Sequence, residues 1–225
     1  YAMKFKNESE MFEFMEKNFY AGALSDILDE MGYRECAASP HAMIRPLHPG
    51  MVCAGRARTL LNAPAKTGTE DPYRLAIEVV DSLKPGEVTV ASSDKPVETG
   101  IMGELSARAM AKRGARGCIV DGYTRDARKI IQHGFPTFAR GVSPIDTTER
   151  VMVVEYDCPV IIGGRRVLPG QIIFADLDGI VFIPREVEMD VIMEAAKRVE
   201  VESEIRGGFI EGATMRDMWD KYHVL

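Results

Sequence analysis

Several residue types that mark common protein chemistries are scarce in this chain. Its 225 residues include four cysteines, four histidines and one tryptophan. The cysteines are scattered without a Cys-x-x-Cys pair, so neither a disulfide framework nor a structural zinc site is expected. Cys118 lies in an apolar run and is predicted to be a buried, reduced thiol.

The chain also lacks a basic surplus, a long apolar run and an apolar core near its N-terminus. Its net charge of -6 argues against non-specific nucleic-acid binding, which needs a basic footprint. No apolar run approaches the roughly 18–20 residues of a membrane span, and nothing resembles the apolar core of a signal peptide. We therefore expect a reduced, soluble, cytoplasmic protein with no nucleic-acid or membrane partner.

Common catalytic signatures are missing too. The histidines have no partner pattern that would indicate a Ser-His-Asp triad. Ser106 and Ser143 lack the context of a nucleophile elbow. No Gly-x-Gly-x-x-Gly opens a helix after a strand, so neither a dinucleotide site nor a nucleotide-dependent methyltransferase is predicted.

What is present is ordinary for a globular protein. The chain is 46% hydrophobic and 28% charged, and its length suits a single domain over residues 1–225, or one core with appended helices. No linker, internal repeat or low-complexity tract divides it.

Apolar periodicity predicts helices at both ends of the chain. The expected helical segments are Glu10–Tyr20, Asp26–Glu30 capped by Ser25, a helix starting at Pro72, Ala127–His133, Glu186–Ile205 ended by Gly207-Gly208, and Thr214–Tyr222.

Short strands fill the middle of the chain. The expected strands are Gly55–Leu60, Val88–Val90, Phe135–Ala139, Val151–Glu155, Pro159–Ile162, Gln171–Asp176 and Ile180–Ile183. Gly163-Gly164 and Asp178-Gly179 are candidate hairpin turns. Asn62–Asp71, Ser92–Thr99 and Gly141–Glu149 are predicted loops. This order predicts an α+β fold, with a layered β/β/α core and flanking N- and C-terminal helices.

The stretch from Gly103 to Asp126 carries the candidate chemistry. A glycine turn at Gly103 opens a helix, an apolar strand follows at Cys118–Val120, and Asp121–Asp126 forms a second, charged turn. A helix that packs back along its strand brings its start near the end of that strand. Glu104, Arg125 and Asp126 would then meet the free N–H groups of the helix start, as in a metal and oxo-acid site.

Each piece of this stretch also has an ordinary structural explanation. Gly103–Ser106 is compatible with a plain helix start, because an acidic first turn suits the helix dipole. Arg125-Asp126 is compatible with a surface ion pair of little energetic worth. The position of the pair after a strand and a glycine favours function, since such loops commonly carry binding residues.

The combination resembles the class II-type 4-hydroxy-4-methyl-2-oxoglutarate aldolases and the related regulators of ribonuclease E activity, the RraA-like family. The matching residues are Gly103-Glu104-Leu105-Ser106, then twenty residues between Glu104 and Arg125, and then Arg125-Asp126. Other segments also look like the family, including Gly55-Arg56-Ala57, Pro85-Gly86-Glu87-Val88 and Ala175-Asp176-Leu177-Asp178-Gly179. The resemblance covers roughly residues 20 to 210.

The resemblance implies a swivelling-type β/β/α core that assembles into a trimer or a dimer of trimers, with sites at subunit boundaries. It implies that Asp126 binds Mg²⁺ or Mn²⁺ and that Arg125 binds the oxo-acid end of the substrate. Gly103–Ser106 would hold the pyruvate carboxylate through backbone N–H groups. Glu104, where the best-known aldolases have aspartate, would act on the metal through water.

A glutamate from the last helix of a neighbouring subunit is also expected to complete the site, with Glu200, Glu202 and Glu204 as candidates. The implied activity is cleavage of a 4-hydroxy-2-oxo acid to pyruvate and an oxo compound, together with oxaloacetate decarboxylation. The alternative is a non-catalytic protein that binds and regulates a ribonuclease. The acidic composition excludes neither.

Overall fold

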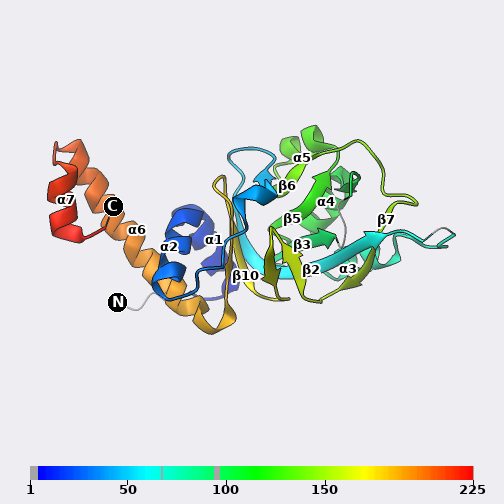
Figure 1. Ribbon diagram of the computed structural model, residues 1–225, viewed down its shortest axis with the longest axis horizontal. Helices are drawn as coiled ribbons and strands as arrows, with labels where there is room; N and C mark the ends of the chain where they lie inside the picture. The colour runs from blue at the N-terminus through cyan, green and yellow to red at the C-terminus, as the bar shows by residue number, and fades with distance from the viewer. Residues whose placement is uncertain (1–4, 67, 94–96, 225) are drawn as a thin grey trace.

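The computed structural model describes residues 5–66, 68–93 and 97–224, and it has the predicted α+β fold (Figure 1). A strand-rich body carries helices against one face of its sheet. A group of helices from both ends of the chain packs against one end of that body. None of the helices among the described residues combines the length and the apolar content that a membrane-spanning helix needs.

A mixed sheet, nine-stranded within the described residues, forms the centre of the molecule. Its strand order is β1 (Arg45–Pro46), β6 (Thr137–Val142), β5 (Gly117–Thr124), β3 (Glu87–Ser93), β2 (Cys53–Pro64), β10 (Ile172–Ala175) and β11 (Ile180–Ile183). Beside this path, β4 (Gly100–Met102) pairs with β5, and β7 (Val151–Tyr156) pairs with β2.

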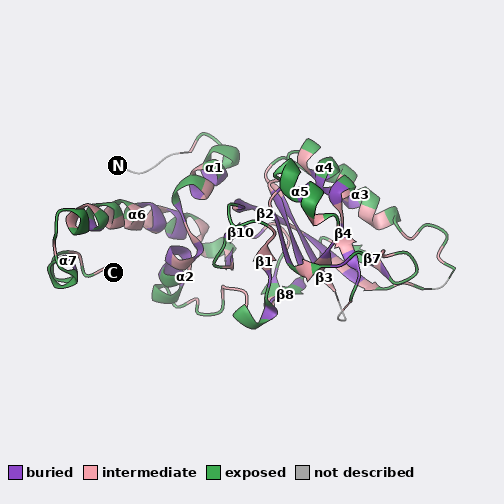
Figure 2. Cartoon of the chain, turned by 90° about the horizontal axis from the view of Figure 1, so that it is seen from above, coloured by how far each residue is buried: buried purple, intermediate pink, exposed green. Residues whose placement is uncertain are grey.

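The middle strands β2, β3, β5 and β6 run parallel to one another. Parallel neighbours need crossover connections, and here the helices are α3 (Arg74–Ser82), α4 (Glu104–Lys112) and α5 (Ala127–His133). These three helices lie on one face of the sheet (Figure 2). A helix that follows a parallel strand begins at the carboxyl edge of the sheet, where open α/β sheets bind ligands.

The opposite face of the sheet is covered by a second β layer. The hairpin β8 (Val160–Ile162) and β9 (Arg165–Val167) pairs antiparallel and shares a buried cluster with sheet residues such as Val90 and Phe138. Gly163 and Gly164 have φ values of 55° and 78°, which an Asn-Gly or Gly-Gly type I′ turn requires. The predicted hairpin at these glycines is therefore confirmed.

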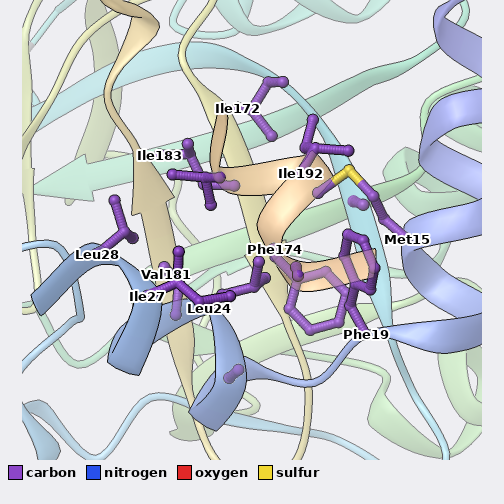
Figure 3. Close-up of a cluster of buried hydrophobic side chains, with 14 of the residues drawn as sticks. Met15, Phe19, Leu24, Ile27, Leu28, Ile172, Phe174, Val181, Ile183 and Ile192 are labelled. Carbon is purple, nitrogen blue, oxygen red and sulfur yellow. The ribbon is translucent and has the colours of Figure 1, made fainter. Parts of the chain in front are cut away.

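The helices at the two chain ends form a separate apolar layer against β10 and β11. They are α1 (Glu8–Asn18), α2 (Ala21–Glu30) and α6 (Glu188–Ile210). Met15, Leu24 and Ile192 meet Phe174 of β10 in a fully buried cluster (Figure 3). The burial of these side chains holds together two segments that are more than 150 residues apart in sequence, as the residue numbers show.

Several helix bounds differ from their prediction, and α1, for example, spans Glu8–Asn18 rather than Glu10–Tyr20. Helix α2 begins at Ala21, so Ser25 lies inside it and caps nothing. Ala21 starts the helix because its N–H donates to the Asp176 carboxylate, at 2.8 Å, from a distant turn. Helix α3 begins at Arg74 rather than at Pro72.

Several strands extend into segments predicted as loops. Strand β2 continues through Asn62 to Pro64, where β7 pairs with it, and β6 continues to Val142. Ser92 and Ser93 end β3, whereas residues 94–96 of the predicted loop lie outside the described part of the chain. Pairing with a neighbouring strand satisfies the backbone hydrogen-bonding groups of these residues. Local sequence signals do not reveal such pairing.

The predicted end of the longest helix is wrong. Helix α6 runs through Gly207-Gly208 to Ile210. A Cβ at Gly208 would lie 2.6 Å from the Met218 sulfur, so this glycine allows α7 (Met215–Tyr222) to pack closely. Thr214 and Asp217 form a capping box at the start of α7, close to the predicted start of that helix.

Candidate functional site

The parallel pairing of β4 with β5 brings the two ends of the Gly103–Asp126 stretch together. Met102 lies beside Thr124, and the Arg125 N–H donates to the Met102 carbonyl at 2.8 Å. Strand β5 continues to Thr124, so Asp121–Thr124 belongs to the strand and not to the predicted second turn. The turn consists of Arg125 and Asp126, directly beside the start of α4.

Asp126 connects the starts of α4 and α5. It occupies the N-cap position of α5 in the left-handed region, with φ 58°, but its side chain does not cap that helix. Instead, its Oδ2 accepts the backbone N–H of Glu104, the first residue of α4, at 3.3 Å. A non-glycine residue in this conformation stores strain of about 1 kcal/mol or more, and such strain is concentrated at functional sites.

Gly103 makes this close approach possible. A Cβ at this position would lie 2.9 Å from Asp126 Oδ2 and 3.1 Å from Arg125 Cγ. Both contacts are tighter than side chains normally allow. The glycine therefore lets the α4 start, the carboxylate and the arginine share one small space.

The Glu104 side chain points to a different partner. Its carboxylate makes an ion pair with Arg108, one turn further along α4, and its side chain is 11% exposed. Glu104 contributes its backbone N–H to the contact with Asp126, but it does not line the cavity at the α4 start. The Glu104 backbone therefore lies at the site, whereas its carboxylate contacts Arg108.

Leu105 and Ser106 present free amides at the same place. In the described chain, the first α4 amide with an intrahelical acceptor is that of Ala107, which donates to Gly103. The N–H groups of Leu105 and Ser106 have no protein acceptor among the described residues, as is usual in a first helical turn. Both residues line a cavity of about 340 Å³, together with Gly103, Arg125 and Asp126.

Asp146, from the loop after β6, is a site residue that sequence reasoning missed. Arg125 Nη1 donates to Asp146 Oδ1 at 2.6 Å, while Arg125 Nε lies 3.7 Å from Asp126 Oδ2. Hydrogen bonds from the Thr148 hydroxyl and backbone lower the pKa of Asp146 to about 2, and the Arg125 charge adds to this effect. The guanidinium is therefore held between two carboxylates that both line the cavity.

Tyr73 and Asn62 also line the cavity and were missed. The Tyr73 hydroxyl lies 2.8 Å from Thr148 Oγ1, which ties α3 to the Asp146 loop. Asn62 is buried on β2, where its Nδ2 donates to the Ser92 carbonyl at 3.0 Å. Asn62 directly follows the apolar pair Leu60-Leu61 and was predicted to begin a loop, whereas Tyr73 and Asp146 stand in segments with no distinguishing pattern.

The residues at the cavity fit a lightly coordinated hard cation better than a protein cage. No group of three or more His, Cys, Asp or Glu residues able to hold a metal exists in the described chain. Asp126 offers a carboxylate whose side chain is 37% exposed and held in place by the α4 start. Mg²⁺ commonly binds through one or two carboxylates and otherwise through water and substrate oxygens, so the donor set is suitable.

The three candidate glutamates of α6 differ in their surroundings. Glu202 accepts from the Tyr20 hydroxyl and pairs with Arg206, and Glu204 accepts from Tyr222 at 2.9 Å. Glu200 is exposed and has no ion pair among the described residues. Of the three, Glu200 is therefore the one free to meet another subunit.

Comparison with known proteins decides the family. The family model "RraA-like: Aldolase/RraA" matches residues 23–182, well over half of the chain. The chain belongs to the RraA-like family. The matched region contains nearly all of the main sheet, most of α2, all of α3 to α5 and the Gly103–Asp126 stretch.

Relatives of this RraA-like chain include proteins of different lengths. "Protein DlpA" of Legionella pneumophila is 27% identical over 206 residues, which is 91% of this chain but 32% of that protein. The chain thus spans about a third of the Legionella protein. A Halalkalibacterium halodurans protein named "Putative 4-hydroxy-4-methyl-2-oxoglutarate aldolase" is 28% identical over 155 residues, covering 69% of this chain and 70% of the relative.

Solved structures show the same fold. The RraAS2 protein of Streptomyces coelicolor, described as an unusual member of the RNase ES inhibitor RraA family, is 27% identical with a TM-score of 0.76. That match covers 91% of this RraA-like chain and 99% of the Streptomyces chain. The Thermus RraA, described as an RNA-processing inhibitor, is 25% identical with a TM-score of 0.56, over 72% of this chain and 92% of that chain.

Proposed function

We propose that this RraA-like chain is a divalent-metal-dependent carbon–carbon lyase. It cleaves a 4-hydroxy-2-oxo acid, such as 4-hydroxy-4-methyl-2-oxoglutarate, to pyruvate and an oxo compound, and it decarboxylates oxaloacetate as a side reaction. The observation that supports this most directly is the convergence of Arg125, Asp126 and the free α4 amides on one cavity.

The α4 start is the proposed carboxylate site. The N–H groups of Leu105 and Ser106 lie in the first helical turn and have no acceptor within residues 5–66, 68–93 and 97–224, and the helix dipole adds positive potential there. Because Gly103 has no side chain, an acid group can approach these amides closely. The pyruvate half of the substrate would bind in this orientation, with its 2-oxo group towards Arg125.

Arg125 is the proposed partner of the developing oxyanion. Cleavage leaves negative charge on the enolate of pyruvate, and a planar, permanently charged guanidinium suits such an oxygen. A preorganised donor of this kind is typically worth roughly 3–4 kcal/mol in the transition state. Asp146 and Asp126 hold the Arg125 guanidinium before substrate arrives, so little reorganisation is needed.

Asp126 is the proposed holder of Mg²⁺ or Mn²⁺. When bound there, the cation supplies positive charge beside the 2-oxo and carboxylate oxygens of the substrate. Asp126 keeps its carboxylate in position through the Glu104 amide, and it leaves the rest of its oxygen surface accessible.

Glu104 is the proposed acceptor, through water, of the substrate hydroxyl proton. To act in this way, its carboxylate must exchange Arg108 for a water. This exchange requires the Glu104 side chain to rotate away from Arg108 and towards the cavity. The decarboxylation of oxaloacetate needs no such proton transfer and depends on the enolate-stabilising groups alone.

A second copy of the chain is part of the proposal. We infer a homotrimer or a dimer of trimers in which a C-terminal glutamate of one subunit reaches the cavity of the next. The structure favours Glu200 for this role, because Glu202 and Glu204 already have partners within their own chain.

A second candidate function is regulation of a ribonuclease by binding. The name of the Streptomyces neighbour, which links it to an RNase ES inhibitor family, favours it. An intact Arg125-Asp126 pair inside a cavity favours the lyase, since a binding surface does not require it. The two functions are separated by testing whether the purified chain binds ribonuclease E while it fails to release pyruvate.

The decisive assay for the lyase follows pyruvate release with oxaloacetate and with 4-hydroxy-4-methyl-2-oxoglutarate. We expect turnover of both substrates with Mg²⁺ or Mn²⁺ and its loss on chelation. An absence of pyruvate from both substrates at any metal concentration would refute the proposed function.

A further inference from the structure

A second cavity, of about 390 Å³, adjoins the candidate site. Sheet residues form its floor, among them Leu60, Ala91 and Cys118, and the facing sides of α3 and α4 form its walls. We call it the α3–α4 chamber. Its volume lies within the usual range for a small-molecule pocket.

The chamber is continuous with the cavity of the candidate site. Asn62, Tyr73, Leu105 and Ser106 line both, so the free α4 amides stand at the junction of the two spaces. A carboxylate bound at these amides therefore has the polar cavity on one side, with Arg125 and Asp126, and the chamber on the other.

The chamber is apolar, in contrast to the site cavity. Besides its aliphatic lining, Cys118 borders it, and burial raises the pKa of the Cys118 thiol to about 11, so the thiol is neutral. The acidic side chain at its edge, Asp81, is already paired with Arg113. None of the described lining residues is a lysine or an arginine. A carboxylate against these apolar side chains would meet no opposite charge and would lose part of its hydration.

Small side chains keep the chamber open between the two helices. Ala76 of α3 and Ala109 of α4 line it where larger residues would otherwise close the space, and Thr89 lies on its floor. The chamber opens to solvent between the two helices, because Ile77, Leu105 and Ala109 on its walls are exposed. An open apolar space beside a polar cavity is the arrangement expected for an amphipathic ligand.

We propose that the α3–α4 chamber receives the distal end of the substrate, and that this end is an uncharged alkyl or aryl group. The preferred substrates are then 4-hydroxy-2-oxo monocarboxylates with an apolar tail, ahead of those with a second carboxylate. This inference rests on the proposed function for the position of the 2-oxo acid end. It adds that substrates are distinguished by the charge and polarity of their distal group.

The test compares two non-cleavable probes of matched shape, 5-methyl-2-oxohexanoate and 2-oxoglutarate. They differ in having two methyl groups or two carboxylate oxygens at the distal end. Titration calorimetry with the full chain and Mg²⁺ measures both dissociation constants, together with those of pyruvate, 2-oxobutanoate and 2-oxohexanoate. We expect affinity to rise roughly two- to fourfold for each added methylene, and the branched monocarboxylate to bind at least tenfold more tightly than 2-oxoglutarate.

Two variants locate the effect in the chamber. Ala109→Leu fills the chamber from α4, and Ala109 does not line the site cavity. This variant should abolish the gain in affinity with chain length, while the affinity for pyruvate stays unchanged. Lys112→Leu places the same side chain at an exposed position of the same helix, outside both cavities. This control should keep the gain in affinity with chain length.

Each contrary result has its own meaning. Equal or tighter binding of 2-oxoglutarate overturns the inference, and if oxaloacetate is still turned over, the proposed function survives. If affinity still rises with chain length in Ala109→Leu, the inference is also overturned, because the apolar tail then lies outside the chamber. If Ala109→Leu instead changes the sedimentation coefficient of the assembly and leaves the gain intact, the chamber is covered by a second copy of the chain. Absence of binding by every 2-oxo acid refutes both proposals.

Discussion

At the scale of single residues, Arg125 is the best-defined member of the candidate site. Its guanidinium lies between Asp126, its neighbour in sequence, and Asp146, which comes from the loop after β6. These two carboxylates fix the orientation of the guanidinium, and Arg125 lines the cavity. The sequence showed the Arg125-Asp126 pair, but Asp146 could not be predicted because only the pairing of β5 with β6 brings its loop alongside.

Arg125→Lys tests whether the planar guanidinium is needed or whether a positive charge alone is sufficient. Lysine keeps the charge but loses the planar pair of donors, so we expect kcat for oxaloacetate to fall roughly a hundredfold or more. Steady-state kinetics of pyruvate release measure this fall. Arg140→Lys, a matched change at a cation that pairs with Asp121 outside the cavity, should have nearly normal kinetics. A near-normal rate for Arg125→Lys would assign Arg125 a structural role.

Asp146→Asn tests the positioning of Arg125. With the charge of Asp146 removed, the guanidinium is held less firmly, and we expect kcat/KM to fall about tenfold. Glu149→Gln, in the same loop and exposed, is the control. A normal kcat/KM in Asp146→Asn would show that Arg125 does not need this partner.

The pH profile gives a second readout for Asp146. Because the pKa of this carboxyl is lowered to about 2, it is ionised throughout the range above pH 4. Its contribution to stability is present above its ordinary pKa and is lost only as the pH falls towards 2. Asp146→Asn should therefore leave the shape of the pH–rate curve between pH 4 and 8 unchanged. A shifted acid limb in the variant would contradict the low pKa.

At the scale of helices and strands, local patterns predicted most elements but not their ends. Ala127–His133 was predicted with its observed bounds, and the hairpins at Gly163-Gly164 and Asp178-Gly179 were correct. Gly163 and Gly164 lie in the left-handed region, which is a local requirement that a sequence can show. The continuation of α6 through Gly207-Gly208 depends on packing against α7, which no local signal contains.

Tyr20→Phe tests the contact between the start of α2 and α6. The Tyr20 hydroxyl donates to the Glu202 carboxylate, and burial together with this bond raises the pKa of Tyr20 to about 12. The stabilising contribution is thus fully present below pH 10 and is lost as the pH rises from 10 to 12. We expect the variant to lose about 1 kcal/mol at pH 8, which corresponds to a fall in Tm of about 2–4 °C.

Thermal unfolding at several pH values measures this effect. The difference in Tm between wild type and Tyr20→Phe should shrink as the pH rises from 10 to 12. Tyr33→Phe provides the control, since the Tyr33 hydroxyl has no hydrogen bond within the described chain. A difference that stays constant across this range would show that the Glu202 contact contributes nothing specific.

At the scale of the whole molecule, the site lies at one edge of the main sheet, between the sheet and the helices on one of its faces. The carboxyl ends of β2 and β5, the starts of α3 and α4, and the loop after β6 all border the cavity. A parallel sheet places helix starts and loops at one edge, which explains how segments distant in sequence converge there. The fold class followed from the order of elements, whereas this convergence required the strand order.

The helical end of the molecule lies on the other side of β10 and β11 from the candidate site. In Figure 1, α6 and α7 project away from the strand-rich body. Exposed apolar side chains gather on this projection, among them Ile210, Met215 and Trp219. Such a surface is compatible with the proposed assembly, in which the end of one subunit contacts another.

The central claim is that the cavity at Gly103–Asp126 is the site of a metal-dependent lyase. The most direct measurement is the rate of Mg²⁺-dependent pyruvate formation from oxaloacetate by Asp126→Ala. Asp190→Ala, which removes an exposed carboxylate in the first turn of α6, serves as the control. The proposed site predicts loss of the metal-dependent rate in Asp126→Ala and a normal rate in Asp190→Ala. Full retention of the metal-dependent rate in a folded Asp126→Ala protein would contradict it.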